Sequence, residues 1–174
     1  MRNIVFVGLM GAGKTTVGRR LAKRHAWPFV DIDHEIEARC GASVATIFDL
    51  EGEEGFRKRE SRVIEEVMAR SGVVVTTGGG AVLRTENRAA LAKGFVIYLD
   101  ADPEQLWVRL KTDTTRPLLT QSGDPRATLV ALHAARDPLY RDMADLIVPT
   151  TRASVSVVMR SIEQGLEQAE IFPS

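Results

Sequence analysis

The chain has 174 residues, of which 44% are hydrophobic and 26% are charged. This length fits one domain, and the composition is that of an ordinary globular protein. Twenty-three Lys and Arg residues balance 23 Asp and Glu residues, so the formal net charge is zero. The overall charge gives no support to a nucleic-acid-binding or membrane-surface protein, and any basic site must therefore be local.

The single cysteine and the amino-terminal residues bear on where the protein resides. Cys40 alone cannot form an intramolecular disulfide, which fits a reducing compartment. The apolar run after Arg2 is soon ended by Lys14 and Arg19, so it does not fit a signal peptide. No apolar stretch approaches the roughly 20 residues of a membrane-spanning helix. We therefore expect a cytoplasmic protein.

Short apolar runs alternate with helical patterns along the chain. Val73–Val75 and Phe95–Leu99 are continuous apolar runs, which are typical of strands buried on both faces of a parallel sheet. The first helix is expected to begin at Gly13 or Lys14. The pattern predicts an α/β fold, a three-layer sandwich around a central five-stranded parallel sheet. The expected strands are Ile4–Val7, Phe29–Ile32, Val73–Thr77, Phe95–Leu99 and Leu146–Val148.

Asp-Pro pairs mark helix starts in the second half of the chain. Asp102-Pro103 predicts one start, with Gln105 reaching back as in a capping box. Asp124-Pro125 predicts a helix that ends near residue 136, and Asp137-Pro138 predicts the start of another. The polar segment 112–124 between the first two pairs is expected to be mobile.

The stretch GLMGAGKT at residues 8–15 satisfies the phosphate-loop pattern, with a strand before it and a helix after it. Gly11 and Gly13 let backbone N–H groups approach phosphate oxygens, aided by the positive end of the following helix. Lys14 is expected to reach the β- and γ-phosphates of a nucleotide, and the Thr15 hydroxyl is expected to bind Mg²⁺. The sequence therefore predicts a nucleotide-binding protein.

Two carboxylates and a helical pair of charges point to a second ligand. Asp31 and Asp33 follow a strand and are expected to face the same way at its carboxyl end, where ligands of open α/β sheets collect. A turn or helix-cap pair is the alternative. Arg57 and Glu60 lie three residues apart, a spacing that alone would also fit a solvated helix face.

A glycine turn and two further arginines complete this second group. Gly78–Gly80 directly follow a buried strand and permit backbone to pack against a ligand. Arg116 lies in the polar segment, and Arg136 precedes an Asp-Pro pair. An arginine fork can hold a carboxylate through two parallel hydrogen bonds, which fixes its orientation as well as its charge.

Six motifs occur in the order and approximate spacing of the shikimate kinases: GLMGAGKTTVGRRLA, FVDID, GEEGFR, TTGGG, RPLL and RDPLY. From residue 3 to about 150 the chain resembles this family, a branch of the nucleoside-monophosphate-kinase-like P-loop fold. The resemblance implies transfer of the γ-phosphoryl group of ATP to the 3-hydroxyl of shikimate, in the chorismate pathway to aromatic amino acids. It also implies one P-loop kinase domain, 1–174, with a lid at 112–124 and a substrate-binding helical segment at 33–61.

The resemblance implies a role for each matching residue on the acceptor side. Asp33 matches the aspartate that hydrogen-bonds the ring hydroxyls, and it would orient the acceptor or act as its base. Arg57 and Arg136 match the arginines that hold the shikimate carboxylate. The backbone around the ring is matched by Gly78, Gly79 and Gly80.

On the nucleotide side, Arg116 matches the lid arginine that closes over the phosphates, and Asp31 matches the acid near Mg²⁺. The implied catalytic residues are Lys14, Asp33 and Arg116. The implied ATP contacts are Gly11, Ala12, Gly13, Lys14, Thr15, Thr16, Arg109, Arg116 and Arg152, and the implied metal site is Thr15 with Asp31. We expect a monomer that acts on ATP and shikimate, with no nucleic acid or membrane as a partner.

Two alternatives stay open at this point: a sister kinase on the same fold, and a nucleotide-dependent switch without transferase activity. A gluconate kinase would also need an anion clamp, and a nucleoside monophosphate kinase would need a base pocket, for which the sequence carries no signal. A nucleotide-dependent switch would need no carboxylate clamp and no acceptor. A GTPase would carry Asn-Lys-x-Asp for guanine, but the nearest match, Leu110–Asp113, has Leu in place of Asn.

Overall fold

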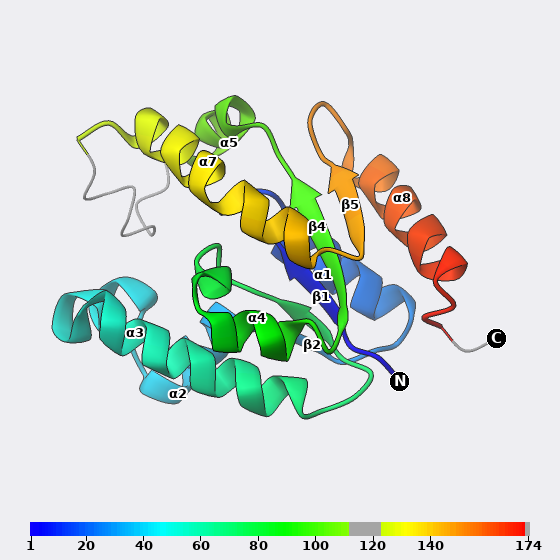
Figure 1. Cartoon of the computed structure of the whole chain (residues 1–174), viewed down its shortest axis with the longest axis horizontal. Coiled ribbons are helices and arrows are strands. Elements are labelled where there is room, and N and C mark those ends of the chain that lie inside the picture. The colour runs from blue at the N-terminus through cyan, green and yellow to red at the C-terminus, as the bar shows by residue number, and fades with distance from the viewer. Residues whose placement is uncertain (112–122, 173–174) are drawn as a thin grey trace.

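The structure, a computed structural model, describes residues 1–111 and 123–172 (Figure 1). In this part of the chain, five parallel strands form one sheet in the order β2-β3-β1-β4-β5. The strands are β1 (Ile4–Val7), β2 (Phe29–Asp31), β3 (Val74–Thr76), β4 (Phe95–Asp100) and β5 (Leu146–Pro149). The predicted five strands are confirmed, and no strand end differs from its predicted position by more than one residue.

Helices cover both faces of the sheet, so the predicted three-layer α/β sandwich is confirmed. Figure 1 shows α7 crossing in front of β4, while α2, α3 and α4 gather beside one another. In the described residues the helices are α1 (Lys14–Arg24), α2 (Ile32–Cys40), α3 (Val44–Met68), α4 (Thr85–Leu91), α5 (Pro103–Leu110), α7 (Pro125–Met143) and α8 (Val155–Gln168). A short 3-10 turn, η1, spans Ala81–Leu83, and none of these helices is long and apolar enough to cross a membrane.

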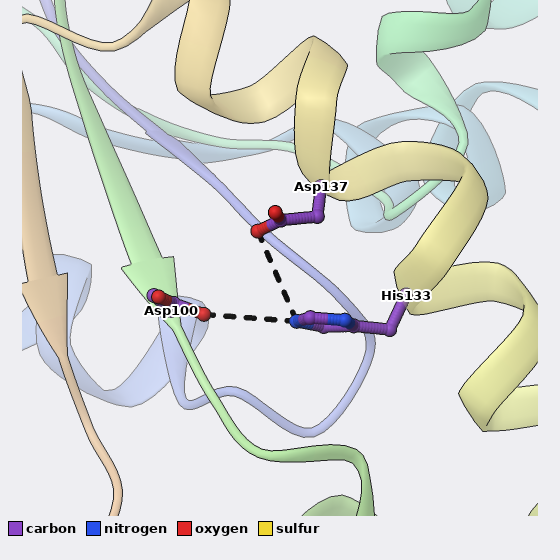
Figure 2. A group of neighbouring side chains, drawn as sticks. All are labelled: Asp100, His133 and Asp137. Atoms are coloured by element: carbon purple, nitrogen blue, oxygen red, sulfur yellow. Dashed lines mark ion pairs between the residues drawn. The ribbon is translucent and has the colours of Figure 1, made fainter.

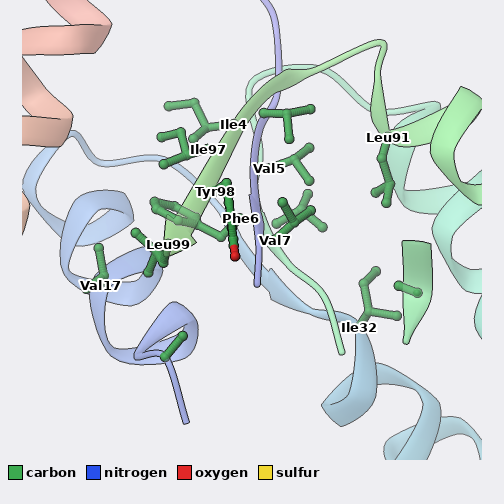
Figure 3. Close-up of a cluster of buried hydrophobic side chains, with 14 of the residues drawn as sticks. Ile4, Val5, Phe6, Val7, Val17, Ile32, Leu91, Ile97, Tyr98 and Leu99 are labelled. Atoms are coloured by element: carbon green, nitrogen blue, oxygen red, sulfur yellow. The ribbon is translucent and has the colours of Figure 1, made fainter. Parts of the chain in front are cut away.

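The core lies around β1 and β4, the central strands. Every residue of β1 is fully buried, as are Val96, Ile97 and Leu99 of β4. Figure 3 shows Val17 of α1 on one side of these strands and Leu91 of α4 on the other. Continuous apolar runs are required here because both faces of each strand meet a helix layer. Because all the strands of the sheet are parallel, their carboxyl ends lie at one edge. The phosphate loop and the glycine turn follow strands at this edge.

Asp33 does not lie on the strand where the sequence pattern placed it. Strand β2 ends at Asp31, and Ile32 already begins α2, with the Asp31 carboxylate capping that helix by accepting from the His34 N–H at 3.0 Å. Asp33 therefore lies in the first turn of α2, not on the strand. The alternation argument was wrong for this pair, and the capping alternative holds for Asp31.

Two helix signals were also misread. Asp102 caps α5 as expected, but Gln105 does not reach back, because its side-chain oxygen accepts from the Arg152 N–H at 3.3 Å. Asp124 caps α7, yet this helix continues through Pro138 to Met143 and does not stop near residue 136. The predicted lid, 112–124, lies outside the described residues except for Gly123 and Asp124.

Candidate active site

The phosphate loop joins β1 to α1 through three glycines with positive φ. The φ angles are 144° at Gly8, 80° at Gly11 and 96° at Gly13. A side chain at Gly8 would also bring its Cβ within 2.7 Å of the Leu99 carbonyl oxygen. Helix α1 begins at Lys14 with Gly13 as its cap, as predicted. The sequence folds this way locally because only glycine adopts these angles without strain.

Lys14 points back along this loop. Its ammonium group donates to the carbonyl oxygens of Gly8 and Leu9, at 2.6 and 2.8 Å, and its side chain is buried. Ala12 is also buried, and its N–H donates to the Leu9 carbonyl at 3.2 Å. These hydrogen bonds therefore hold the loop in place around the Lys14 ammonium group, at the amino end of α1.

A cleft of about 740 Å³ opens beside the loop. Its walls include the predicted nucleotide residues Gly11, Gly13, Lys14, Thr15 and Thr16, together with Asp31 and Asp33. Arg109 of α5 lies at the same loop, where it donates to the Gly11 carbonyl at 3.0 Å. Arg152 has a φ of 56° in the turn after β5. The roles of these two arginines in ATP binding stay predictions, and Arg116 lies outside the described residues.

Hard oxygen ligands meet at the predicted magnesium site. The Thr15 hydroxyl donates to Asp31 Oδ2 at 2.8 Å, and the Thr76 hydroxyl donates to the same oxygen at 2.9 Å. Hydroxyl and carboxylate oxygens fit the ligand preference of Mg²⁺. Thr76 was missed from the sequence, although it ends the strand that pairs with β2 at Asp31.

A second pocket adjoins the cleft and shares Met10, Asp33, Val44, Gly78 and Gly79 with it. Three helices bring its charged residues together: α2 carries Asp33, α3 carries Arg57 and Glu60, and α7 carries Arg136. Arg57 and Arg136 are only 7% and 3% exposed, and Glu60 is fully buried. The solvated-face alternative for Arg57 and Glu60 is therefore wrong.

The glycine turn explains how these side chains fit together. A Cβ added at Gly80 would lie 2.1 Å from Arg57 Nη2, and one at Gly78 would lie 2.8 Å from Asp33 Oδ1. A Cβ at Gly79 would lie 3.1 Å from Arg136 Nη1. Each glycine thus makes room for one of the predicted acceptor-binding side chains. None of the three has a positive φ, so close approach, and not backbone angle, requires glycine here.

The two arginines retain hydrogen-bonding capacity. Arg57 donates to Glu60 at 2.8 Å, but among the described residues its Nε and the Nη1 of Arg136 are buried without a hydrogen-bond partner. Burial raises the pKa of Glu60 to about 7, and the ion pair with Arg57 offsets only part of this effect. The pocket sets two guanidinium groups against the carboxylates of Asp33 and Glu60, and Glu60 is only partly ionised near pH 7. The remaining positive charge favours an anionic ligand.

Other residues of the pocket were missed from the sequence. Met10, Val44, Phe48 and Phe56 supply apolar walls, and no spacing rule marks them as ligand contacts. Tyr140 donates its hydroxyl to the Gly79 carbonyl at 2.6 Å, and burial raises its pKa to about 12. Its position four residues after Arg136 could have placed it on the same face of α7.

The comparisons with known proteins agree with this geometry. The family model described as shikimate kinase matches residues 10–167. A shikimate kinase of Ralstonia nicotianae is 56% identical over 97% of this chain and 89% of its own, and that of Cupriavidus pinatubonensis is 55% identical over 96% and 87%.

A solved structure extends the likeness to three dimensions. The shikimate kinase from Acinetobacter baumannii, determined in complex with shikimate, has a TM-score of 0.94 and 42% identity, covering 99% of this chain and 96% of that one. The shikimate kinase from Aquifex aeolicus has a TM-score of 0.82 at 31% identity, covering 97% and 98%. With the family model and these relatives spanning nearly its whole length, the chain belongs to the shikimate kinase family.

Proposed function

We propose that this protein transfers the γ-phosphoryl group of ATP to the 3-hydroxyl of shikimate, giving shikimate 3-phosphate and ADP. The observation that carries this proposal is the pair of buried arginines, each with a donor left over, in a pocket that shares its walls with the phosphate cleft. Family membership supports the reaction class, and the relative from A. baumannii was solved in complex with shikimate.

Arg57 and Arg136 would hold the carboxylate of the acceptor. Guanidinium forks bind carboxylates with fixed geometry, and two forks from different helices would fix the ring in one orientation. The apolar side chains of Phe48 and Phe56 line this pocket, and by lowering the local dielectric they would strengthen the contact. Glu60 accepts from Arg57 Nη1 at 2.8 Å and Glu53 accepts from Nη2 at 3.4 Å, so the unpartnered Nε is the donor that remains for the ligand.

Asp33 would act on the acceptor hydroxyl. Its carboxylate lies beside Gly78, in the wall common to both pockets. During transfer the hydroxyl oxygen forms a bond to the γ-phosphorus, the bond to the ADP oxygen breaks, and the hydroxyl proton must leave. Asp33 would orient this hydroxyl and accept its proton.

The phosphate loop would hold the donor. The loop N–H groups, the amino end of α1 and Lys14 offset the charge that spreads over the phosphoryl oxygens in the transition state, and Arg116 would add a further cation from the lid. Thr15 and Asp31 would hold Mg²⁺, Asp31 through water. When bound, the metal would neutralise phosphate charge and align the β- and γ-phosphates.

The rival readings fit the pocket less well. A nucleotide-dependent switch binds no acceptor and would not need two buried arginines beside the phosphate cleft. A nucleoside monophosphate would need a pocket for its base, whereas the second pocket is lined by the guanidinium groups of Arg57 and Arg136. Gluconate is also a carboxylate and stays the nearest alternative acceptor.

The remaining expectations are part of the same proposal. We infer one kinase domain over 1–174, with a lid at 112–124 that closes over the phosphates and a substrate-binding segment at 33–61. The protein would act as a cytoplasmic monomer on ATP and shikimate, with no nucleic acid or membrane as a partner. The balanced charge and the single cysteine support this.

ADP release from MgATP, with shikimate, gluconate and AMP offered separately, tests the function. We expect release only with shikimate. Release with gluconate or AMP would keep the kinase but discard the proposed acceptor. ATP binding without acceptor-dependent release would favour the switch.

A further inference from the structure

A polar network outside the acceptor pocket joins the end of β4 to α7 (Figure 2). The Tyr98 hydroxyl donates to Asp137 Oδ1 at 2.7 Å and to Asp100 Oδ1 at 3.3 Å. Arg141 donates to the second oxygen of each carboxylate, through Nε at 2.9 Å to Asp137 and through Nη2 to Asp100. One tyrosine and one arginine therefore bind both carboxylates at once.

His133 faces the same two carboxylates. Its Nε2 lies 3.7 Å from Asp100 Oδ1 and 3.8 Å from Asp137 Oδ1, beyond hydrogen-bond distance. Two carboxylates and an imidazole could suggest a cation site, but all four carboxylate oxygens already accept from Tyr98 or Arg141. Burial would raise the pKa of Asp137, yet the hydrogen bonds from Tyr98 and Arg141 outweigh it and hold that pKa below its usual value. We therefore treat the group as a structural network.

The network spans a weak point in α7. Pro138 lies inside this helix and has no N–H, so the carbonyl of Ala134 loses its helical donor. Asp137 precedes the proline and Arg141 follows it, and the contact between them crosses the interruption. The second carboxylate held by Arg141 belongs to β4, so the sheet braces both halves of the helix.

Tyr98 links this brace to the acceptor pocket. Its ring lies 4.9 Å from the ring of Tyr140, tilted by 34°, and both rings are buried. Tyr140 in turn donates to the Gly79 carbonyl. Arg136 precedes Asp137 directly, so the residue that the network holds adjoins a proposed carboxylate-binding arginine.

We propose that Tyr98 and Asp137 are positioning residues, which set the orientation of α7 at Pro138 and thereby hold Arg136 toward the acceptor carboxylate. This proposal rests on the proposed function for the identity of the acceptor. It predicts that the hydrogen bonds of the network affect shikimate binding without affecting ATP binding, because these bonds join β4 to α7. The Tyr98 ring also lies beside Gly8 of the phosphate loop, so the test must keep the ring.

Tyr98→Phe keeps the ring on Tyr140 and removes only the hydroxyl. We expect the KM for shikimate to rise about three- to tenfold, with kcat and the KM for ATP within about twofold of wild type. Ile97→Val is the matched control: it lies next in the same buried strand, is fully buried, and should leave both KM values unchanged. Asp137→Asn retains an acceptor for Tyr98 and should be milder than Asp137→Ala.

The decisive step repeats Tyr98→Phe in an Arg136→Ala background. If the hydroxyl acts through Arg136, its effect on the KM for shikimate should fall below about 1.5-fold there. An equal effect in both backgrounds, an equal rise in the KM for ATP, or no effect in wild type would overturn the proposal.

A measurement without acceptor separates this proposal from the proposed function. Amide hydrogen exchange on both sides of Pro138, from Asp137 to Met143, should be faster in Tyr98→Phe than in wild type or Ile97→Val, with the first two turns of α7 unchanged. Unchanged exchange would show that the Tyr98 hydroxyl does not hold α7 at Pro138, even if shikimate is the acceptor. Faster exchange would support this positioning role even if wild type released no ADP with shikimate.

Discussion

The Lys14 ammonium group already donates hydrogen bonds to two carbonyl oxygens of the phosphate loop, those of Gly8 and Leu9. To reach a phosphate it must release at least one of them, and the phosphate charge favours that exchange. Lys14→Ala should therefore lower kcat by about 10²- to 10³-fold, with an unchanged far-ultraviolet circular dichroism spectrum. Lys23→Ala, exposed on the same helix, is the control. Residual activity above about a tenth would contradict the assignment.

Asp33 is the residue whose role in the chemistry depends most on its charge. Asp33→Asn keeps the size of the side chain but removes the base, so kcat should fall by about 10²-fold or more while shikimate still binds. Steady-state kinetics with a direct binding measurement separate the two effects, and Asp142→Asn on the exposed side of α7 is the control. Weaker shikimate binding with an unchanged kcat would show that Asp33 contacts the acceptor but does not act as its base.

Glu60 should make stability depend on pH. Its pKa in the folded protein is about 7, above the unfolded value of 4.5, so the folded state holds the proton more tightly. This contribution is fully present below about pH 4.5 and is lost as pH rises to about 7, by on the order of 3 kcal/mol.

Glu60→Gln removes that titration. Its free energy of unfolding relative to wild type, measured in urea from pH 5 to pH 8, should rise with pH and level off above about 7. Other titrating groups cancel in the difference. A difference that does not vary with pH would show that Glu60 is ionised throughout.

Among elements, the glycine turn after β3 carries the sharpest prediction. Gly80→Ala places a methyl group 2.1 Å from Arg57 Nη2, within a buried ion pair that cannot move freely. The KM for shikimate should rise about tenfold or more. The Cβ of Gly79→Ala would come no closer than 3.1 Å, to Arg136 Nη1, so this substitution should be milder. The reverse order of severity would contradict this account of the turn.

The elements also show what the sequence could predict. The strands were found because their apolar runs are buried on both faces, and the phosphate loop because its glycines and lysine have fixed spacing. The helix through Pro138 was missed because an Asp-Pro pair is a local signal, while the contacts of Asp137 that hold this helix come from β4 and Arg141.

The same limit applies to the pocket. Three glycines indicated a close backbone approach, but which side chains approach depends on three helices meeting at one edge of the sheet. The apolar walls, Thr76 and Tyr140 are likewise tertiary contacts. The resemblance supplied the roles of Arg57 and Arg136, because the spacing of Arg57 and Glu60 alone also fitted a solvated helix face.

At the scale of the molecule, the sheet edge brings a donor site and an acceptor site together. The phosphate loop follows β1, the glycine turn follows β3, and α7 carries Arg136 to the glycine turn. We infer that this arrangement recognises a carboxylate and aims the attached ring at the γ-phosphate. A neutral analogue of the acceptor separates the contribution of the carboxylate from that of the ring.

The measurement is kcat/KM for shikimate and for its methyl ester, with wild type and with Arg136→Ala. Wild type should prefer the acid by about 30-fold or more, because a buried charge pair contributes about 2–4 kcal/mol. Arg136→Ala should narrow that preference at least tenfold, chiefly through a higher KM for the acid. Equal use of acid and ester by wild type, or a preference that Arg136→Ala leaves unchanged, would contradict the carboxylate clamp.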